Sequence, residues 1–220
     1  GQIREAVEII RRVLTGDKVT FEGRWYRCRN FRLAIAPPPR PVPIYLAALG
    51  PRMLELAGEV ADGVLLNWIA PEGVPAALRH VEQGARRAGR SLADFDVAAF
   101  IRTAVTDEPD DARQALGREI TGYAIVDAYA RFFAECGYAS EVEAVNAAWK
   151  AGDRGGAVKQ VSRRVLEGLG VVGAEDFCRS RFAEFARQGL TQPVLIPIAL
   201  GPDPKAALLR AVRGLAPERT

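Results

Sequence analysis

The residues best suited to contact a ligand lie in the segment AALGP, at positions 47 to 51. Small side chains at Ala47, Ala48 and Gly50 would let a ligand approach the backbone closely. Free amides at the start of a following helix would favour a phosphate group. The same residues also fit a tight turn between a strand and a helix, and the residues alone favour this simpler interpretation.

Further polar or aromatic residues lie near the ends of other predicted strands. Asn67 could donate a hydrogen bond to a ligand carbonyl or cap a turn, and the two interpretations are equally supported. Trp68 could stack on a ring, although a buried aromatic at a rim is the commoner case. Arg102 and Thr103 interrupt another apolar run, and an outward-facing position is favoured slightly over a place in a pocket.

A basic and aromatic segment near residue 25 superficially suggests nucleic-acid binding. Trp25 and Tyr26 are surrounded by Arg24, Arg27, Arg29 and Arg32. The solvated face of a two-stranded ribbon explains the pattern equally well, and the net charge of the whole chain is only +3. We therefore expect no nucleic-acid partner.

The sequence predicts neither a metal site nor a catalytic nucleophile. The three cysteines are far apart, and the single histidine, His80, is expected on a helix surface without a catalytic partner. Signatures of dinucleotide, nucleoside-triphosphate, zinc-protease and α/β-hydrolase sites do not occur. The sequence has neither a signal-peptide pattern nor an apolar run of membrane-spanning length. We expect no metal, no membrane association and a cytoplasmic location.

Four apolar runs predict the strands that would position these residues. They lie at residues 43–48, 64–68, 95–106 and 191–200, with predicted helices between them. The first two are apolar almost throughout, a pattern typical of parallel strands that are covered on both faces. Strict alternation of strands and helices predicts an α/β fold. Four such units are half of an eight-stranded barrel.

The remaining segments predict additions to one domain over residues 1–220. An amphipathic helix at the first residues precedes a β-hairpin at 17–34 and a proline-rich connector. Residues 110–170 are mostly helical and too long for a simple crossover, which predicts a helical insertion. Its aromatic residues would roof a cavity, form a dimer surface or, most simply, fill the helix core: Tyr123, Tyr129, Phe132 and Phe133.

The stretch PVPIYLAALGPRMLELAGEVADGVLLN, at residues 41–67, resembles the bacterial luciferase-like superfamily. Within it, the likeness is greatest to coenzyme F420-dependent oxidoreductases, including the methylenetetrahydromethanopterin reductase type. The stretch GAEDFCRSRFAEFARQGLTQPVLIPIALGPDP is similar to that family's last helix, last strand and glycine–proline turn. The leading helix, hairpin and proline connector follow the family order, so the resemblance covers nearly the whole chain.

The resemblance implies a (β/α)8 TIM barrel of which this chain has about the second half, namely strands 5–8 and a helical insertion. The first four strands, which in the family supply most acid and base residues, are expected to be missing. A helix that begins at the first residue without a cap agrees with this expectation. No catalytic residue is therefore predicted.

The resemblance also implies the site residues and the activity. The phosphate-bearing tail of the cofactor would contact Ala48, Leu49, Gly50, Arg52 and Met53, and the substrate would contact Asn67 and Trp68. The implied activity is that of an oxidoreductase, with hydride transfer between F420 and a small organic substrate. The alternatives are an FMN-dependent monooxygenase and a non-catalytic half-barrel that needs a partner chain. We expect a homodimer or pairing with a missing N-terminal half.

Overall fold

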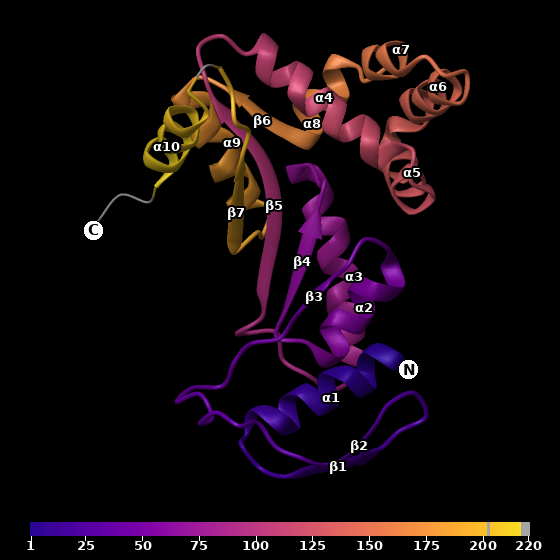
Figure 1. Ribbon diagram of the computed structural model, residues 1–220, viewed down its shortest axis with the longest axis vertical. Coiled ribbons are helices and arrows are strands. Elements are labelled where there is room, and N and C mark those ends of the chain that lie inside the picture. Colours follow the sequence, from indigo (N-terminus) through magenta and orange to yellow (C-terminus); the bar gives the residue numbers. More distant parts are fainter. Residues whose placement is uncertain (202, 217–220) are drawn as a thin grey trace.

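A computed structural model describes residues 1–201 and 203–216 of the chain (Figure 1). Pro202, in the expected glycine–proline turn, and residues 217–220 of the predicted domain lie outside the described residues. In chain order the elements are α1 (Gln2–Leu14), β1 (Val19–Glu22), β2 (Arg27–Phe31), β3 (Tyr45–Ala47), α2 (Pro51–Val60), β4 (Gly63–Asn67), η1 (Pro71–Gly73), α3 (Val74–Arg87), β5 (Asp96–Val105), α4 (Asp110–Ala124), α5 (Asp127–Phe133), η2 (Ala134–Tyr138), α6 (Ala139–Lys150), α7 (Arg154–Lys159), α8 (Arg163–Leu169), β6 (Gly170–Gly173), α9 (Glu175–Arg187), β7 (Gln192–Pro197) and α10 (Pro204–Leu215).

The main sheet has five parallel strands, and β5 lies at its centre. One edge of β5 pairs first with β4 and, beyond Phe100, with β6. The opposite edge pairs with β7, from Ala98 to Thr103. The strand β3 pairs with β4 alone, so β3 and β7 each have one neighbour among the described strands. The described sheet is therefore open at both sides.

The prediction of an α/β fold with parallel strands is confirmed, but the predicted number of strands is wrong by one. The additional strand is β6, whose four residues GVVG directly follow the last turn of α8 and were not predicted as a strand. A run this short, with glycine at each end, has no strand signature of its own. It is a strand because its backbone pairs with Arg102 to Val105 of β5.

The expectation that both faces of β3 are buried is also wrong. Ala47 is exposed, and Tyr45 and Leu46 are half-buried. The reason is the position of β3 at the outer side of the described sheet. An apolar run therefore predicted the strand correctly and its burial incorrectly.

One face of the sheet forms the main core with the helices around it. Alternate side chains of β4 and β5, such as Val64 and Ile101, pack with residues of α2, α3, α9 and α10. The intervening side chains face the other way, and Leu65, Phe100 and Val194 are only half-buried there. Period-two alternation thus gives this sheet one fully packed face and one partly exposed face.

The helices α4 to α8 gather beyond the carboxyl end of β4, at the top right of Figure 1. They have a separate core, in which Phe133 is buried and Tyr123, Tyr129 and Phe132 are partly buried. The interpretation as helix core is confirmed for Tyr123, Tyr129 and Phe133, whereas Phe132 packs on this core and also lines a pocket. That this block, residues 110–170, is an insertion into a barrel stays a prediction.

At the opposite end of the molecule, α1 lies against the antiparallel pair β1 and β2 (Figure 1). The Glu5 carboxylate accepts hydrogen bonds from the amides of Arg24, Trp25 and Tyr26, at 2.8–2.9 Å. These contacts attach the turn of the hairpin to α1. In the described part of the chain, every helix is too short or too polar to cross a lipid bilayer.

Candidate functional site

A pocket of about 220 Å³ lies at the carboxyl ends of β3 and β4. Ala48 and Leu49 line it just after β3, and Asn67 lines it at the end of β4. The helix α3 contributes His80, and the segment that ends α5 and forms η2 contributes Phe132 and Cys136. Most of the wall is apolar. Ligands of α/β proteins bind at this end of parallel strands, so the pocket is the candidate site.

The first turn of α2 is suited to hold an anion beside this pocket. Gly50 precedes the helix, and its carbonyl accepts the amides of Met53 and Leu54 at 3.0 and 3.1 Å. The amides of Leu49, Gly50 and Arg52 have no acceptor among the described residues. A Cβ placed on Gly50 would meet no atom within 4 Å. Free donors next to open space fit a phosphate group.

Four of the five predicted cofactor residues line two different hollows, and Gly50 lines neither of them. Ala48 and Leu49 line the pocket, together with Pro51 from the start of α2. Arg52 and Met53 line a different hollow, beside α1. Each helical residue turns by about 100°, so residues that follow Pro51 directly point away from the pocket. Contact of the Arg52 side chain with a phosphate stays a prediction that this geometry does not favour.

The side chain of Asn67 lies at the pocket wall within a hydrogen-bond network. Its Nδ2 donates to the Tyr129 hydroxyl at 2.9 Å, and its Oδ1 accepts from Nη1 of Arg102. The Nε of Arg102 donates to Glu119 at 2.9 Å, and the guanidinium lies 3.9 Å from the centre of the Trp68 ring. Residues from β4, β5, α4 and α5 therefore meet here.

The expectation that Arg102 and Thr103 face solvent is wrong. Arg102 is 6% exposed and Thr103 is fully buried. The carboxylate of Glu119 balances the charge of Arg102, and two aromatic rings, Trp68 and Tyr123, lie against the guanidinium. Pairing and cation–π contacts allow a charge to occupy this position.

Trp68 is buried in the helical core and is not part of the pocket wall. Its φ of +54° lies in the left-handed region, which costs a non-glycine residue about 1–2 kcal/mol. The ring packs edge-on against Tyr123 and Phe133, at 5.1 and 6.3 Å between centroids. Its indole N–H has no partner among the described residues. Trp68 thus joins the sheet to the helical block, and stacking on a ligand ring stays a prediction.

His80 lies on the surface of α3, as expected. The side chain is 39% exposed, lines the pocket, and has Nδ1 at 3.7 Å from the carboxylate of Glu55. This separation is longer than a hydrogen bond, so the absence of a catalytic partner for His80 stays a prediction. Within the described residues, no group of three or more His, Cys, Asp or Glu side chains could hold a metal ion.

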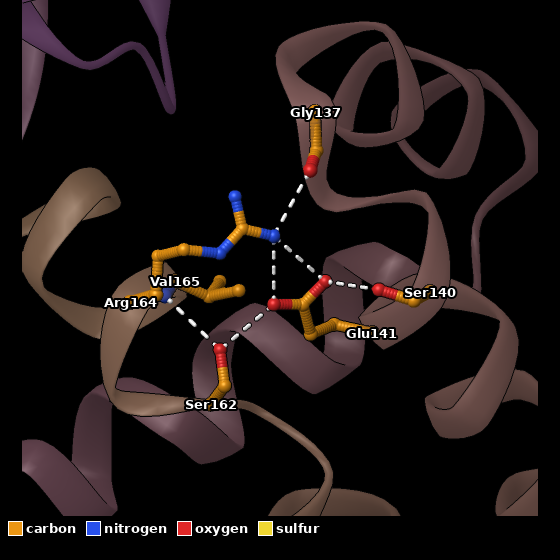
Figure 2. Close-up of polar contacts among 6 residues, drawn as sticks. All are labelled: Gly137, Ser140, Glu141, Ser162, Arg164 and Val165. Atoms are coloured by element: carbon orange, nitrogen blue, oxygen red, sulfur yellow. Dashed lines mark hydrogen bonds and ion pairs between the residues drawn. The ribbon is translucent and has the colours of Figure 1, made fainter.

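A polar cluster fixes the segment that forms one wall of the pocket. Glu135 and Cys136 of η2 line the pocket, and Gly137, with φ of +89°, follows them directly. Figure 2 shows Arg164 donating to the Gly137 carbonyl at 2.9 Å and to both oxygens of Glu141, at 2.8 and 3.0 Å. Ser140 and Ser162 also donate to this carboxylate, each at 2.9 Å (Figure 2). The cluster connects η2, α6 and α8.

We expect Glu141 to make the stability of the fold sensitive to acid. Burial raises its pKa, but the hydrogen bonds from Arg164, Ser140 and Ser162 outweigh burial and lower the pKa to about 2. The ionised form is stabilised in the fold, so this contribution is complete above the unfolded pKa of 4.5 and is lost as the pH falls towards 2. Relative to Glu141→Gln, the native protein should lose about 2–3 kcal/mol of unfolding free energy across this range.

Urea denaturation at a series of pH values measures this difference. Glu143→Gln is a matched control, because Glu143 is an exposed residue of the same helix. It should leave the pH dependence unchanged. Parallel pH profiles for the native protein and Glu141→Gln would contradict the expectation.

Comparisons with known proteins agree on one family. Residues 1–192 match the family described as Luciferase-like monooxygenase. The 5,10-methylenetetrahydromethanopterin reductase of Archaeoglobus fulgidus is 32% identical over 212 residues, which cover 94% of this chain and 63% of that protein. The enzyme of the same name from Methanopyrus kandleri is 31% identical and is covered to 59%. The chain thus spans about three fifths of the length of these curated relatives.

The fold agrees with a solved structure of the same group. The coenzyme F420-dependent tetrahydromethanopterin reductase from Methanopyrus kandleri superposes with a TM-score of 0.80 at 29% identity. The superposition covers 94% of this chain and 59% of that one. The likeness thus extends over the sheet and the helical block.

Proposed function

The chain belongs to the luciferase-like monooxygenase family, and we propose that it takes part in hydride transfer between coenzyme F420 and a small organic substrate. The observation that supports this most is the likeness to an F420-dependent reductase, at 29% identity over 94% of the chain. When bound, the cofactor would supply the hydride chemistry. The chain's own residues would bind, orient and shield it.

The arrangement of the pocket supports these roles. The amides of Leu49 and Gly50 would bind the phosphate of the cofactor tail, because they are free donors beside open space. The apolar wall formed by residues such as Ala48, Leu54 and Phe132 would exclude water. Asn67 would donate a hydrogen bond to an oxygen of the ligand. The alternative is that the pocket binds FMN in place of F420, as in an FMN-dependent monooxygenase. Binding experiments with both cofactors distinguish the two.

We also propose that the five strands form part of the wall of a (β/α)8 barrel, with β3 and β7 pairing with further strands. The open edges of both strands and the partly exposed sheet face support this arrangement. An unpaired, apolar strand edge favours association, either with another segment or with a second copy. Light scattering after size exclusion tests this proposal, and a stable monomer at high concentration would contradict it.

A reducing cytoplasm is the compartment we propose, since all three cysteines are unpaired.

Binding of oxidised F420 should protect Cys136 from a thiol reagent. Cys136 is exposed and lines the pocket, whereas Cys28 is half-buried in the hairpin at the other end of the molecule. Mass spectrometry should therefore show that F420 slows the modification of Cys136 in proportion to occupancy and leaves the rate at Cys28 unchanged. The affinity should lie in the micromolar range, as measured by the fluorescence of the cofactor.

The same titration with FMN distinguishes the two cofactors by their absorption spectra. Protection by FMN and not by F420 would replace the proposed activity with the flavin-dependent one. Absence of binding by both would contradict the proposed function.

A further inference from the structure

We propose that Arg102 is a positioning residue, which orients the Asn67 side chain so that it presents a hydrogen-bond donor to the ligand. The inference rests on the proposed function in one respect, because it takes the pocket beside Asn67 to be the ligand site. It adds a residue to that site that does not line the pocket. It also states the chemistry of the ligand group that Asn67 meets.

The guanidinium of Arg102 is held in place by contacts on several sides. Its Nε donates to Glu119 at 2.9 Å, and its face lies 3.9 Å from the ring centre of Trp68. Its Nη1 donates to Oδ1 of Asn67. With only 6% of the residue exposed, few other orientations are open to this side chain. Arginine has no acceptor atom, so the group that faces Nη1 must be an acceptor.

This requirement determines which end of the Asn67 amide faces the pocket. Since Oδ1 is taken by Arg102, Nδ2 must lie on the other side, where one of its hydrogens is donated to Tyr129 at 2.9 Å. The second hydrogen of Nδ2 remains for a ligand. A flipped amide would place Nδ2 against the guanidinium, so that two donors face each other without an acceptor. Asn67 therefore offers the pocket a donor.

The ligand group recognised at this position is consequently an acceptor, such as a carbonyl or an anionic oxygen. A buried arginine is not needed for stability alone, because apolar residues of similar volume often replace buried ion pairs without loss. The role of Arg102 in orienting Asn67 gives a reason for its position in the middle of β5. Neither Arg102 nor Glu119 lines the pocket itself, and Arg102 reaches it only through its hydrogen bond to Asn67.

Three variants of the 220-residue chain test the inference. Arg102→Met keeps the length and the packing on Trp68 but removes every donor, and Asn67→Asp retains the pair with Arg102 but has no donor for the ligand. Thr121→Val is the control, since among the described residues this buried hydroxyl donates to the Gly117 carbonyl and has no hydrogen bond to Asn67. Two measurements are made on the native protein and on the variants that retain Asn67, and the second is also made on Asn67→Asp. They are the side-chain amide signals of Asn67 in a ¹⁵N–¹H spectrum and the dissociation constant of oxidised F420.

In the native protein, Asn67 should give one pair of resolved amide signals, assigned by their loss in Asn67→Asp. Arg102→Met should shift or broaden these signals and weaken F420 binding by about tenfold, as expected for the loss of one oriented hydrogen bond. Asn67→Asp should weaken binding at least as much while the protein stays folded. Thr121→Val should lower the melting temperature but change neither measurement.

Unchanged amide signals in Arg102→Met would overturn the positioning role, whether or not F420 binds. Altered signals with unchanged F420 affinity would overturn the proposed contact between the Asn67 donor and the ligand. If Arg102→Met does not fold, the F420 affinity of Asn67→Asp tests the inference instead. An affinity equal to that of the native protein would overturn it. If the native chain binds no F420, the proposed function fails, and the amide signals alone then decide the role of Arg102.

Discussion

Replacement of Gly84 by alanine is expected to lower the free energy of unfolding by about 2–3 kcal/mol, although alanine is the better helix former. The reason is the close approach of α2 and α3. A Cβ on Gly84 would lie 1.8 Å from the Glu55 carbonyl oxygen, and a Cβ on Gly58 would lie 1.9 Å from that of Val81. Both neighbours are backbone atoms, so no side-chain rotation relieves the clash. The two helices would have to separate.

Urea denaturation followed by circular dichroism measures this loss. Gly122→Ala is the matched control, because Gly122 lies exposed in α4 and a Cβ there would meet nothing within 4 Å. That substitution should stabilise the protein by up to about 1 kcal/mol, since only helix propensity changes. The same chemical change thus has opposite signs at the two positions. A Gly84→Ala variant as stable as the native protein would show that α2 and α3 are not in backbone contact.

The separation of α2 and α3 would also affect the candidate site. The helix α2 begins at the pocket with Pro51, and α3 contributes His80 to the pocket lining. The two glycines that permit close packing therefore lie between two helices that both line the pocket. In the Gly84→Ala variant that remains folded, we expect weaker F420 binding together with the lower stability.

Local sequence patterns predicted most of the strands and helices that position the site. Each of these signals lies within the element that it predicts. The apolar runs around Leu46 and Leu66 form β3 and β4, and Pro51 begins α2. The strand β6 has no such signal, because only its pairing with β5 makes it a strand. The partial exposure of β3 likewise depends on which neighbours it has, and a run of apolar residues contains no information about that.

The same distinction applies to the site. The small residues of AALGP predicted a tight turn between a strand and a helix, and the resemblance added the ligand site; Gly50 precedes α2 beside open space. Contacts between distant segments were not predictable in this way. Arg102 lies 35 residues from Asn67, and Tyr129 lies 62 residues from it. No spacing rule connects such residues, so an arginine that interrupts a strand was interpreted as outward-facing.

Gly50→Glu is expected to weaken F420 binding by about a hundredfold or more, and Gly50→Gln by about tenfold. Both side chains would occupy the space beside the free amides of Leu49 and Gly50, where we propose that the cofactor phosphate binds. Only glutamate adds a negative charge next to that phosphate. The backbone of Gly50, with φ of −111° and ψ of 168°, is open to any residue, so both variants should fold.

The comparison of the two variants separates charge from size, because glutamate and glutamine have nearly the same shape. A negative charge at the start of α2 favours the helix, so Gly50→Glu should be at least as stable as Gly50→Gln in a thermal melt. Weaker binding in the more stable variant excludes unfolding as its cause. The ratio of the two dissociation constants should decrease as the salt concentration rises, since salt screens the charge of the glutamate and does not change the size of either side chain. Equal weakening by both would mean that no anion binds at Gly50, and native affinity in both would place the cofactor away from this turn.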